Sequence, residues 1–361
     1  MRKVKVDLGK KSYDIVIGYD LDEELVHFVQ QAGFSRQALI VTDSNVGPLY
    51  AGRIQELLES AGLQAVVVEV PAGESSKCLA TAELLYTKAI ELGLDRKSPV
   101  FALGGGVVGD LAGFVAATYM RGVPFIQLPT SLLAQVDSSV GGKVAVNHVL
   151  GKNLIGAFYQ PQAVFMDLAF MHSLPEREIY TGLGEIIKYG IIYDREFFEF
   201  LERNQQSVLA LEPEAATHMI ARSCEIKAAV VSQDEQEAGL RRILNFGHTI
   251  AHTIEKETGY VRYNHGEAVA IGMVGAADIS CQLGLIDKTA AERVTKLITD
   301  LKLPVKAAGC TVDAMYIDIF HDKNTIGGKV NWVLMTGIGT VISRNDVPEA
   351  VVRRAMDARV S

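Results

Sequence analysis

Two histidines four residues apart are the clearest chemical feature of this sequence. His248 and His252 lie in the segment 245–252, and residues four apart on a helix share one face, so both imidazoles can converge on one point. The segment differs from the H-E-x-x-H motif of metalloproteases, because Thr249 stands where that motif has its general-base glutamate. The spacing therefore predicts a metal-binding helix and argues against peptide hydrolysis.

Two further side chains complete a candidate metal site. His265 precedes a Gly-Glu pair, and Glu185 lies in the glycine-flanked segment 184–190. Two histidines and one carboxylate that leave one coordination position open form a familiar catalytic zinc set. The spacing leaves open whether His248 or His252 is the ligand, and a structural role is the alternative for any single histidine.

A glycine-rich turn is the second feature with chemical meaning. The apolar run 99–103 leads directly into the glycines of 104–110, and a helical pattern follows over 111–119. A strand, bare backbone and a helix N-terminus in this order suit a pyrophosphate group, and a tight structural turn is the alternative. The acidic residue that usually binds a ribose about 20 residues later is absent. Asp43, after the strand-like run 38–42, is the better candidate for the ribose hydroxyls.

Lysines flanked by glycines form a third candidate group. Lys143 follows two glycines and Lys152 follows one, in the segments 137–147 and 151–156. Such lysines suit close approach of a phosphate, with backbone amides helping to bind it. The Gly-Lys-Ser/Thr ending of a Walker A loop is missing, which argues against an ATPase or kinase. Other cations that could bind the same anion, or instead lie on solvated faces, are Arg121, Lys188, Lys227, Arg241 and Lys329.

The elements that must position these residues change in character near the middle of the chain. Up to about residue 170, strand-like runs at 38–42, 65–70 and 99–103 alternate with amphipathic helical patterns, as in a parallel α/β sheet. The runs 4–8 and 13–17 predict an antiparallel hairpin at the start. From about residue 175 the periodicity is helical, with a late strand pair expected at 329–334 and 340–343. We therefore predict an α/β domain over 1–174 and a mainly helical domain over 175–361.

Composition narrows the class of protein. The 361 residues carry a formal charge of −8 and are 48% hydrophobic, which disfavours nucleic-acid binding and disorder. Four scattered cysteines without a C-x-x-C pair suit reduced thiols better than disulfides or a thiolate zinc site. The small or apolar stretch 268–277 is too short for a membrane span, and the first residues lack the apolar core of a secretory signal. We expect a cytosolic protein that does not enter a membrane.

Together these segments resemble the 3-dehydroquinate synthase family. The matching stretches are residues 71–74, 104–114, 129–143, 151–161, 174–178, 184–190, 245–252 and 265–267. They occur in the order of the family and extend over nearly the whole chain. The resemblance implies an N-terminal NAD-binding α/β domain, a mainly helical C-terminal metal-binding domain and a homodimer.

The resemblance also implies roles for individual residues. Glu185, His248 and His265 would hold a zinc ion, or cobalt in its place, and His252 would then face the substrate. The NAD site and its junction with the substrate would be lined by Asp43, Asn45, Glu74, Lys77, Gly105, Gly106, Val107, Asp110, Thr130, Ser131, Lys143 and Lys152. Contacts to the substrate would come from Asp137, Asn153, Lys188, Lys227, Arg241, Asn245 and Lys329, besides the two lysines of the NAD group, with Arg121 reaching across a dimer interface.

The implied activity is conversion of 3-deoxy-D-arabino-heptulosonate 7-phosphate to 3-dehydroquinate and phosphate. It would proceed by transient oxidation with NAD, phosphate elimination, re-reduction and intramolecular aldol closure, as the second step of the shikimate pathway to chorismate. Three alternatives remain at this stage: a metal-dependent polyol dehydrogenase, a sugar phosphate cyclase acting on another heptulose or a hexose phosphate, and a non-enzymatic NAD-binding protein.

Overall fold

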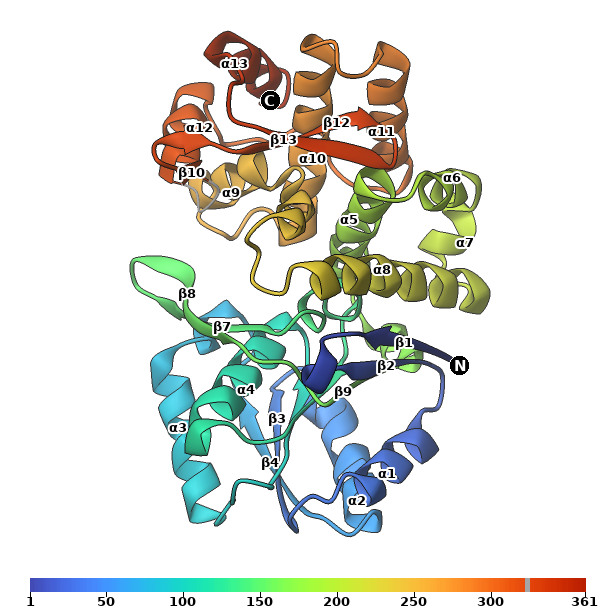
Figure 1. Cartoon of the computed structure of the whole chain (residues 1–361), viewed down its shortest axis with the longest axis vertical. Helices are drawn as coiled ribbons and strands as arrows, with labels where there is room; N and C mark the ends of the chain where they lie inside the picture. Colours follow the sequence, from blue (N-terminus) through green and yellow to red (C-terminus); the bar gives the residue numbers. More distant parts are fainter. Residues whose placement is uncertain (322–324) are drawn as a thin grey trace. The chain divides into compact units, whose positions relative to one another are not determined.

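The computed structural model describes residues 1–321 and 325–361, which form two compact units (Figure 1). The first unit comprises Met1–Leu174 and Lys227–Glu235, and the second comprises Pro175–Ile226 and Gln236–Ser361. The chain thus leaves the first unit between Leu174 and Pro175. The segment Lys227–Glu235, expected in the second domain, belongs instead with the first.

A seven-stranded sheet forms the centre of the first unit, with the order β1-β2-β9-β6-β5-β3-β4. Its strands are β1 (Arg2–Val6), β2 (Tyr13–Gly18), β3 (Gln37–Asp43), β4 (Gln64–Val70), β5 (Val100–Gly104), β6 (Phe125–Pro129) and β9 (Ala163–Asp167). β1 is antiparallel to β2, and the other neighbouring strands are parallel. Strands β5, β6 and β9 are buried at every residue, which explains their near-continuous apolar sequences. The predicted α/β fold and opening hairpin are confirmed.

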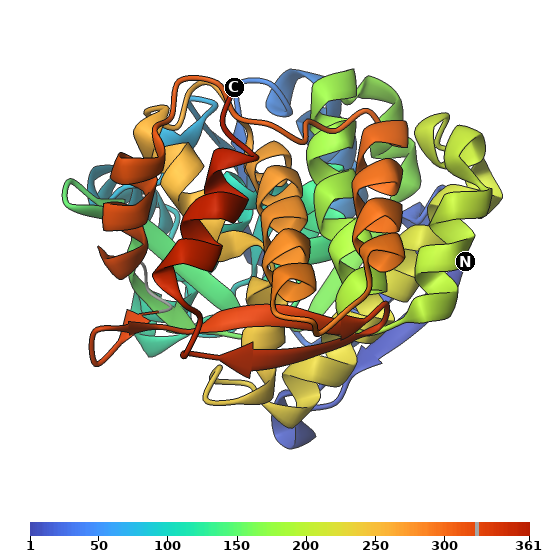
Figure 2. The same cartoon turned by 90° about the horizontal axis from the view of Figure 1, so that it is seen from above.

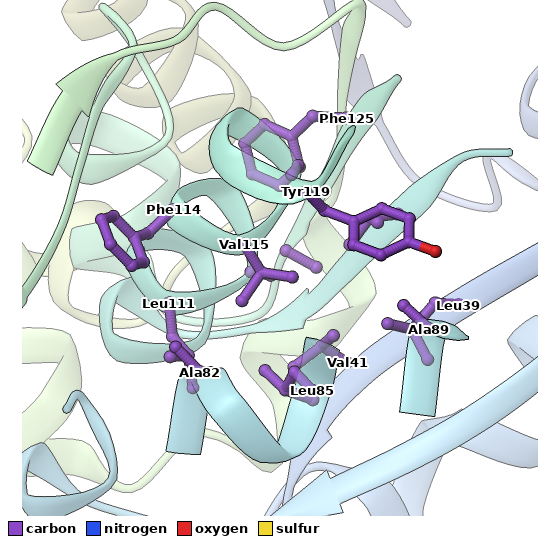
Figure 3. Close-up of a cluster of buried hydrophobic side chains, with 14 of the residues drawn as sticks. Leu39, Val41, Ala82, Leu85, Ala89, Leu111, Phe114, Val115, Tyr119 and Phe125 are labelled. Atoms are coloured by element: carbon purple, nitrogen blue, oxygen red, sulfur yellow. The ribbon is translucent and has the colours of Figure 1, made fainter. Parts of the chain in front are cut away.

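Helices cover both faces of this sheet. α1 (Asp22–Gln31) and α2 (Gly52–Ser60) lie on one side, and α3 (Leu79–Glu91) and α4 (Gly106–Thr118) lie on the other (Figure 1). α3 and α4 pack their apolar side chains against β3 and β5, where Leu85, Leu111 and Val115 are fully buried (Figure 3). This packing fixes the start of α4 at the end of β5, within the glycine-rich turn.

The segments that carry Lys143 and Lys152 form a β-hairpin. β7 (Lys143–His148) pairs antiparallel with β8 (Gly151–Phe158). Alternate residues of β7, Val144 and Val146, are buried in the core of the first unit, so one face of β7 anchors the hairpin. The tip is exposed, with Val149 94% and Leu150 85% accessible.

The second unit is mainly helical, as predicted. Its helices are α5 (Glu176–Ile192), α6 (Arg195–Arg203), α7 (Gln205–Leu209), most of α8 (Pro213–Gln233), α9 (His248–Glu257), α10 (His265–Gln282), α11 (Lys288–Asp300), α12 (Val312–Asp318) and α13 (Glu349–Asp357). α10 contains the small and apolar stretch 268–277 and is surrounded by α5, α9, α11 and α13. A helix that is apolar all round belongs in such a core. Among the described helices, none has the length and apolar character needed to cross a membrane.

Short strands complete the second unit. β12 (Trp332–Gly337) pairs antiparallel with β13 (Thr340–Arg344), and this ribbon packs on α10 (Figure 2). The first strand of the predicted pair therefore begins at Trp332 rather than at residue 329, and extends to Gly337. Lys329 and Val330 form β11 (Lys329–Val330), which pairs with β10 (Thr325–Ile326) instead.

Candidate functional site

Three helices of the second unit bring Glu185, His248 and His265 together. Glu185 lies within α5, His248 is the first residue of α9, and His265 is the first residue of α10. The Glu185 Oε1 atom is 3.6 Å from Nε2 of His248 and 3.5 Å from Nε2 of His265. One ligand atom from each residue lies within 4.8 Å of the other two. Residues that are 17 to 80 positions apart thus converge on one point, and they are the three that the family resemblance implies.

A glycine beside each of these residues lets the helices approach closely. A Cβ at Gly266 would lie 1.8 Å from the carbonyl oxygen of Thr181, and one at Gly184 would lie 2.5 Å from the carbonyl oxygen of Gly266. α9 and α10 meet in the same way, because a Cβ at Gly272 would lie 2.1 Å from the carbonyl oxygen of Gly247. Real side chains do not tolerate such distances. The glycines next to the three candidate ligands therefore set the spacing of the cluster.

The hydrogen bonds of the two imidazoles leave the same ring nitrogen for an ion. Nδ1 of His248 lies 3.1 Å from the carbonyl oxygen of Phe246, and Nδ1 of His265 lies 3.1 Å from Oε1 of Glu255. Both acceptors fix a proton on Nδ1, so Nε2, the nitrogen on the Glu185 side, is the one that can bind an ion. Two Nε2 atoms and a carboxylate oxygen form the donor set of a divalent metal centre.

The electrostatics of the cluster also favour a cation. Glu185 is fully buried and contacts the ammonium group of Lys188. Burial lowers the pKa of His265, but hydrogen bonds to Glu185 and Glu255 outweigh this effect and raise the pKa to about 10. The carboxylates thus stabilise positive charge at the position between the imidazoles. The same carboxylates would stabilise a bound divalent ion, so the residues fit a metal.

Other predicted residues of the second unit surround this cluster or lie near it in sequence. The ring of His252 is 5.5 Å from that of His248, centroid to centroid. Arg241 is 2% exposed on the 3-10 segment Leu240–Asn245, and Asn245 donates a hydrogen bond of 3.0 Å to Glu237. Lys329 differs from these, because its side chain is exposed on β11.

In the first unit, the predicted nucleotide residues follow neighbouring strands. β3 is flanked by β4 and β5, so the strand order reverses between β3 and β5, and α/β proteins bind ligands at the carboxyl ends of strands at such a switch point. Asp43 ends β3, while Gly105 follows β5 and Gly106 begins α4. Val107 occupies the first turn of this helix. No described side chain caps that turn, so its amides can bind a phosphate.

Short contacts bring further predicted residues to this edge of the sheet. Oδ1 of Asp43 accepts hydrogen bonds from the amides of Asn45 at 2.9 Å and Val46 at 3.0 Å, which orients the carboxylate. The amide of Thr130 donates to the carbonyl of Gly104 at 3.0 Å. Ser131, which follows Thr130, is also close to the turn. A Cβ at Gly105 would lie 3.4 Å from the hydroxyl oxygen of Ser131.

A buried lysine connects α4 with the β7–β8 hairpin. Lys77 is 5% exposed, and its ammonium group contacts both Asp110 of α4 and Asn153 of β8. Burial raises the pKa of Asp110 against the opposing effect of Lys77. Asn153 has a φ of +58°, and its amide donates to Asn147 at 2.9 Å. The network fixes the backbone next to Lys152, whose side chain is exposed, as is that of Lys143.

Two other pairs in the first unit involve predicted residues. Lys227 of α8 donates to the carbonyl oxygen of Asp137 at 2.6 Å and forms an ion pair with its carboxylate. Glu74 accepts a hydrogen bond of 2.7 Å from Asn147. Arg121 lies apart from both pairs, with a φ of +68° three residues after the end of α4. Because α4 is about 20 Å long, Arg121 is remote from the amides at its other end.

Three residues that contact the predicted groups were not identified from the sequence. Glu255 contacts His265, Glu237 contacts Asn245, and Asn147 contacts both Glu74 and Asn153. A sequence signal existed for Glu255, because it lies three residues after His252 and therefore on the same helical face. Nothing in the local sequence distinguishes the other two.

Comparison with known proteins identifies the family. The sequence model described as 3-dehydroquinate synthase N-terminal matches residues 67–181, and the one described as 3-dehydroquinate synthase C-terminal matches residues 182–325. A protein of Desulforamulus reducens named 3-dehydroquinate synthase is 51% identical over 351 residues, which cover 97% of this chain and 98% of the relative. The chain belongs to the 3-dehydroquinate synthase family. The resemblance inferred from the motifs is confirmed.

Solved structures of related cyclases share the architecture of this family member. ValA, a 2-epi-5-epi-valiolone synthase from Streptomyces hygroscopicus subsp. jinggangensis 5008 with NAD+ and Zn2+ bound, is 28% identical, with a TM-score of 0.88 over 96% of each chain. A 2-deoxy-scyllo-inosose synthase complexed with carbaglucose-6-phosphate, NAD+ and Co2+ is 26% identical, with a TM-score of 0.90 over 99% of this chain and 100% of that one.

Proposed function

We propose that this chain is a 3-dehydroquinate synthase that uses NAD and a zinc or cobalt ion. It converts 3-deoxy-D-arabino-heptulosonate 7-phosphate to 3-dehydroquinate and phosphate, the second step of the shikimate pathway. The observation that carries the proposal is the convergence of Glu185, His248 and His265 in a chain that is 51% identical to a named 3-dehydroquinate synthase. The two related cyclases bind NAD+ together with Zn2+ or Co2+, which supports the use of NAD and one of these metals by this chain.

Side chains of the second unit suit the anionic groups of this substrate. Lys188 and Arg241 are each 2% exposed, and cations shielded from water bind carboxylate or phosphate strongly. His252, beside His248, offers an imidazole for proton transfer. When bound, the divalent ion supplies Lewis-acid polarisation of a carbon–oxygen bond, and NAD supplies an acceptor and donor of hydride.

Side chains of the first unit suit the dinucleotide. The amides at the start of α4 bind the pyrophosphate, and the carboxylate of Asp43, oriented by two backbone amides, accepts hydrogen bonds from ribose hydroxyls. The contacts of Lys77 with Asp110 and Asn153 hold β8 in place, so that Lys152 is presented on an ordered strand. We assign NAD binding or substrate contact to the remaining residues as the family resemblance implied them.

The deciding assay follows inorganic phosphate and nicotinamide absorbance together. With the heptulosonate phosphate as substrate, we expect phosphate release that needs NAD in catalytic amount and a divalent metal, with no net accumulation of NADH. Removal of the metal with a chelator should abolish turnover, and zinc or cobalt should restore it. Metal-free enzyme that still turned over at the native rate would overturn the metal assignment.

Three other outcomes would overturn the proposed reaction. Net NADH formation without phosphate release would indicate a polyol dehydrogenase. Phosphate release only from a heptulose or hexose phosphate without a carboxylate would indicate another cyclase of the same superfamily. Tight NAD binding with no turnover of any of these substrates would support a non-enzymatic protein.

We also infer a homodimer in the cytosol. The exposed apolar tip of the β7–β8 hairpin, Val149 and Leu150, supports a protein contact, and a second copy would give Arg121 a substrate to contact. None of the four cysteines, all within the described residues, forms a disulfide, which suits a reducing compartment. Sedimentation at micromolar concentration should give twice the monomer mass, and a monomer would contradict the inference.

A further inference from the structure

Glu255 occupies the face of α9 that carries the two histidines of the cluster. Residues 248, 252 and 255 follow the i, i+4, i+7 spacing of a single helical stripe. α9 packs against α10, and across this contact Oε1 of Glu255 lies 3.1 Å from Nδ1 of His265. The side chain of Glu255 is only 14% exposed. A carboxylate so shielded from water needs a polar partner, and His265 is one.

We propose that Glu255 is a positioning residue that holds the imidazole of His265 ready for the metal. The inference rests on the metal centre of the proposed function. A carboxylate oxygen accepts hydrogen bonds, so the contact of 3.1 Å holds a proton on Nδ1 of His265. Nε2, which faces Glu185 at 3.5 Å, is then the nitrogen left to bind the ion. The negative charge of Glu255 also makes the imidazole a stronger ligand.

The two histidines of the cluster differ in what orients them. Nδ1 of His248 is paired with the backbone carbonyl of Phe246, which no side-chain substitution removes. Only His265 depends on a side chain for this contact. The metal centre should therefore respond to changes at Glu255, and the response should come through His265.

The backbone of His265 is held independently of Glu255. Glu267 accepts a hydrogen bond of 2.8 Å from the amide of Asn264 at the start of α10. Arg177 binds the same carboxylate with contacts of 2.8 and 2.7 Å. These bonds fix the first turn of α10, so loss of Glu255 should free the ring of His265 without unfolding the helix.

The test measures metal binding rather than turnover. Metal-free wild type and the variants Glu255→Gln and Glu255→Ala are titrated with zinc against a competing chelator, and the visible spectrum of the cobalt form is recorded. We expect zinc to dissociate about 10 to 100 times more readily from both variants, with an altered cobalt spectrum. Glu257→Gln is the matched control, because Glu257 lies on the same helix and is exposed. Its zinc affinity should equal that of wild type.

The outcomes separate the two proposals. If wild type fails to bind zinc, the metal centre of the proposed function is wrong, and the role of Glu255 is wrong with it. If wild type binds zinc and Glu255→Gln binds it within about threefold of wild type with the same cobalt spectrum, only the role of Glu255 is refuted. Glu255→Gln keeps the shape of the side chain, so it decides the question even where the alanine variant is unstable.

Discussion

Gly266→Ala offers a severe test of how the metal cluster is assembled. The added Cβ would lie 1.8 Å from the carbonyl oxygen of Thr181, whereas ordinary contacts begin at 3.4 Å. The backbones of α5 and α10 would therefore have to separate by about 1.6 Å at this point. Glu185 on α5 and His265 on α10 would separate with them. Metal sites tolerate changes of only about 0.2 Å in ligand distance.

Two measurements follow from this displacement. Urea unfolding of the metal-free protein should show a loss of about 1–3 kcal/mol or more, the range for an overpacked core. Zinc affinity, measured by chelator competition, should fall at least about tenfold, by analogy with the loss of an outer-shell contact.

Gly52→Ala is the matched control for this substitution. Gly52 begins α2 with a φ of −60°, and a Cβ added there would have no other atom within 4 Å among the described residues. Alanine there should raise the free energy of unfolding by about 0.4–1 kcal/mol through the unfolded chain, without changing zinc affinity. A Gly266→Ala protein with wild-type stability and wild-type zinc affinity would refute the close-approach argument.

Three further substitutions are informative. Lys152→Ala should reduce kcat by about 100-fold or more with an unchanged circular dichroism spectrum, because its side chain is exposed on β8. Asp194→Ala should lower the free energy of unfolding by about 1 kcal/mol at pH 7, since Asp194 caps α6 through a 3.0 Å bond from the amide of Phe197 and also binds Arg222. Glu267→Ala should lower the free energy of unfolding by about 1 kcal/mol through loss of the α10 cap. It should also weaken zinc binding, because the first turn of α10 would loosen.

The contribution of Asp194 to the free energy of unfolding should also depend on pH. Burial raises the pKa of Asp194, but hydrogen bonds from Phe197 and Arg222 outweigh it and leave the pKa below 3.8 in the folded state. A carboxyl group with a lowered folded pKa stabilises the protein above its unfolded pKa and loses this effect as the pH falls through the folded value. The stability gap between wild type and Asp194→Ala should be constant at neutral pH and narrow below about pH 3.8. A stability gap that widened in acid would contradict the role of Asp194. Near-normal kinetics for Lys152→Ala would contradict the role of Lys152. Unchanged stability for Glu267→Ala would contradict the role of Glu267 as a cap.

The sequence revealed the elements whose signals are local. β3 and β5 are short apolar runs bounded by polar or glycine residues, and the histidine pair of α9 has helical spacing, so each could be identified without knowledge of its partners. The convergence of Glu185 with His265 was different, because it depends on which helices pack together. That part came from the family resemblance.

Features that depend on tertiary partners were missed for a physical reason. The helical period of α8 continues through Lys227, so nothing local marks that residues 227–235 belong to the first unit. The strand pair at 143–158 was not predicted, because its signal is the burial of Val144 and Val146 in the core of the first unit. At the late ribbon, Asn331 separates β11 from β12, which pair with different strands.

The ion pair between Lys188 and Glu185 has a consequence for the order in which ligands bind. In the metal-free centre, the carboxylates of Glu185 and Glu255 are balanced by Lys188 and by a protonated His265. A divalent ion held by Glu185, His248 and His265 would take the place of that proton and bring one more positive charge than it removes. Loading the ion would therefore make the cluster more positive, and a more positive cluster attracts an anionic sugar phosphate more strongly. Metal first and substrate second is the sequence of events that these charges favour.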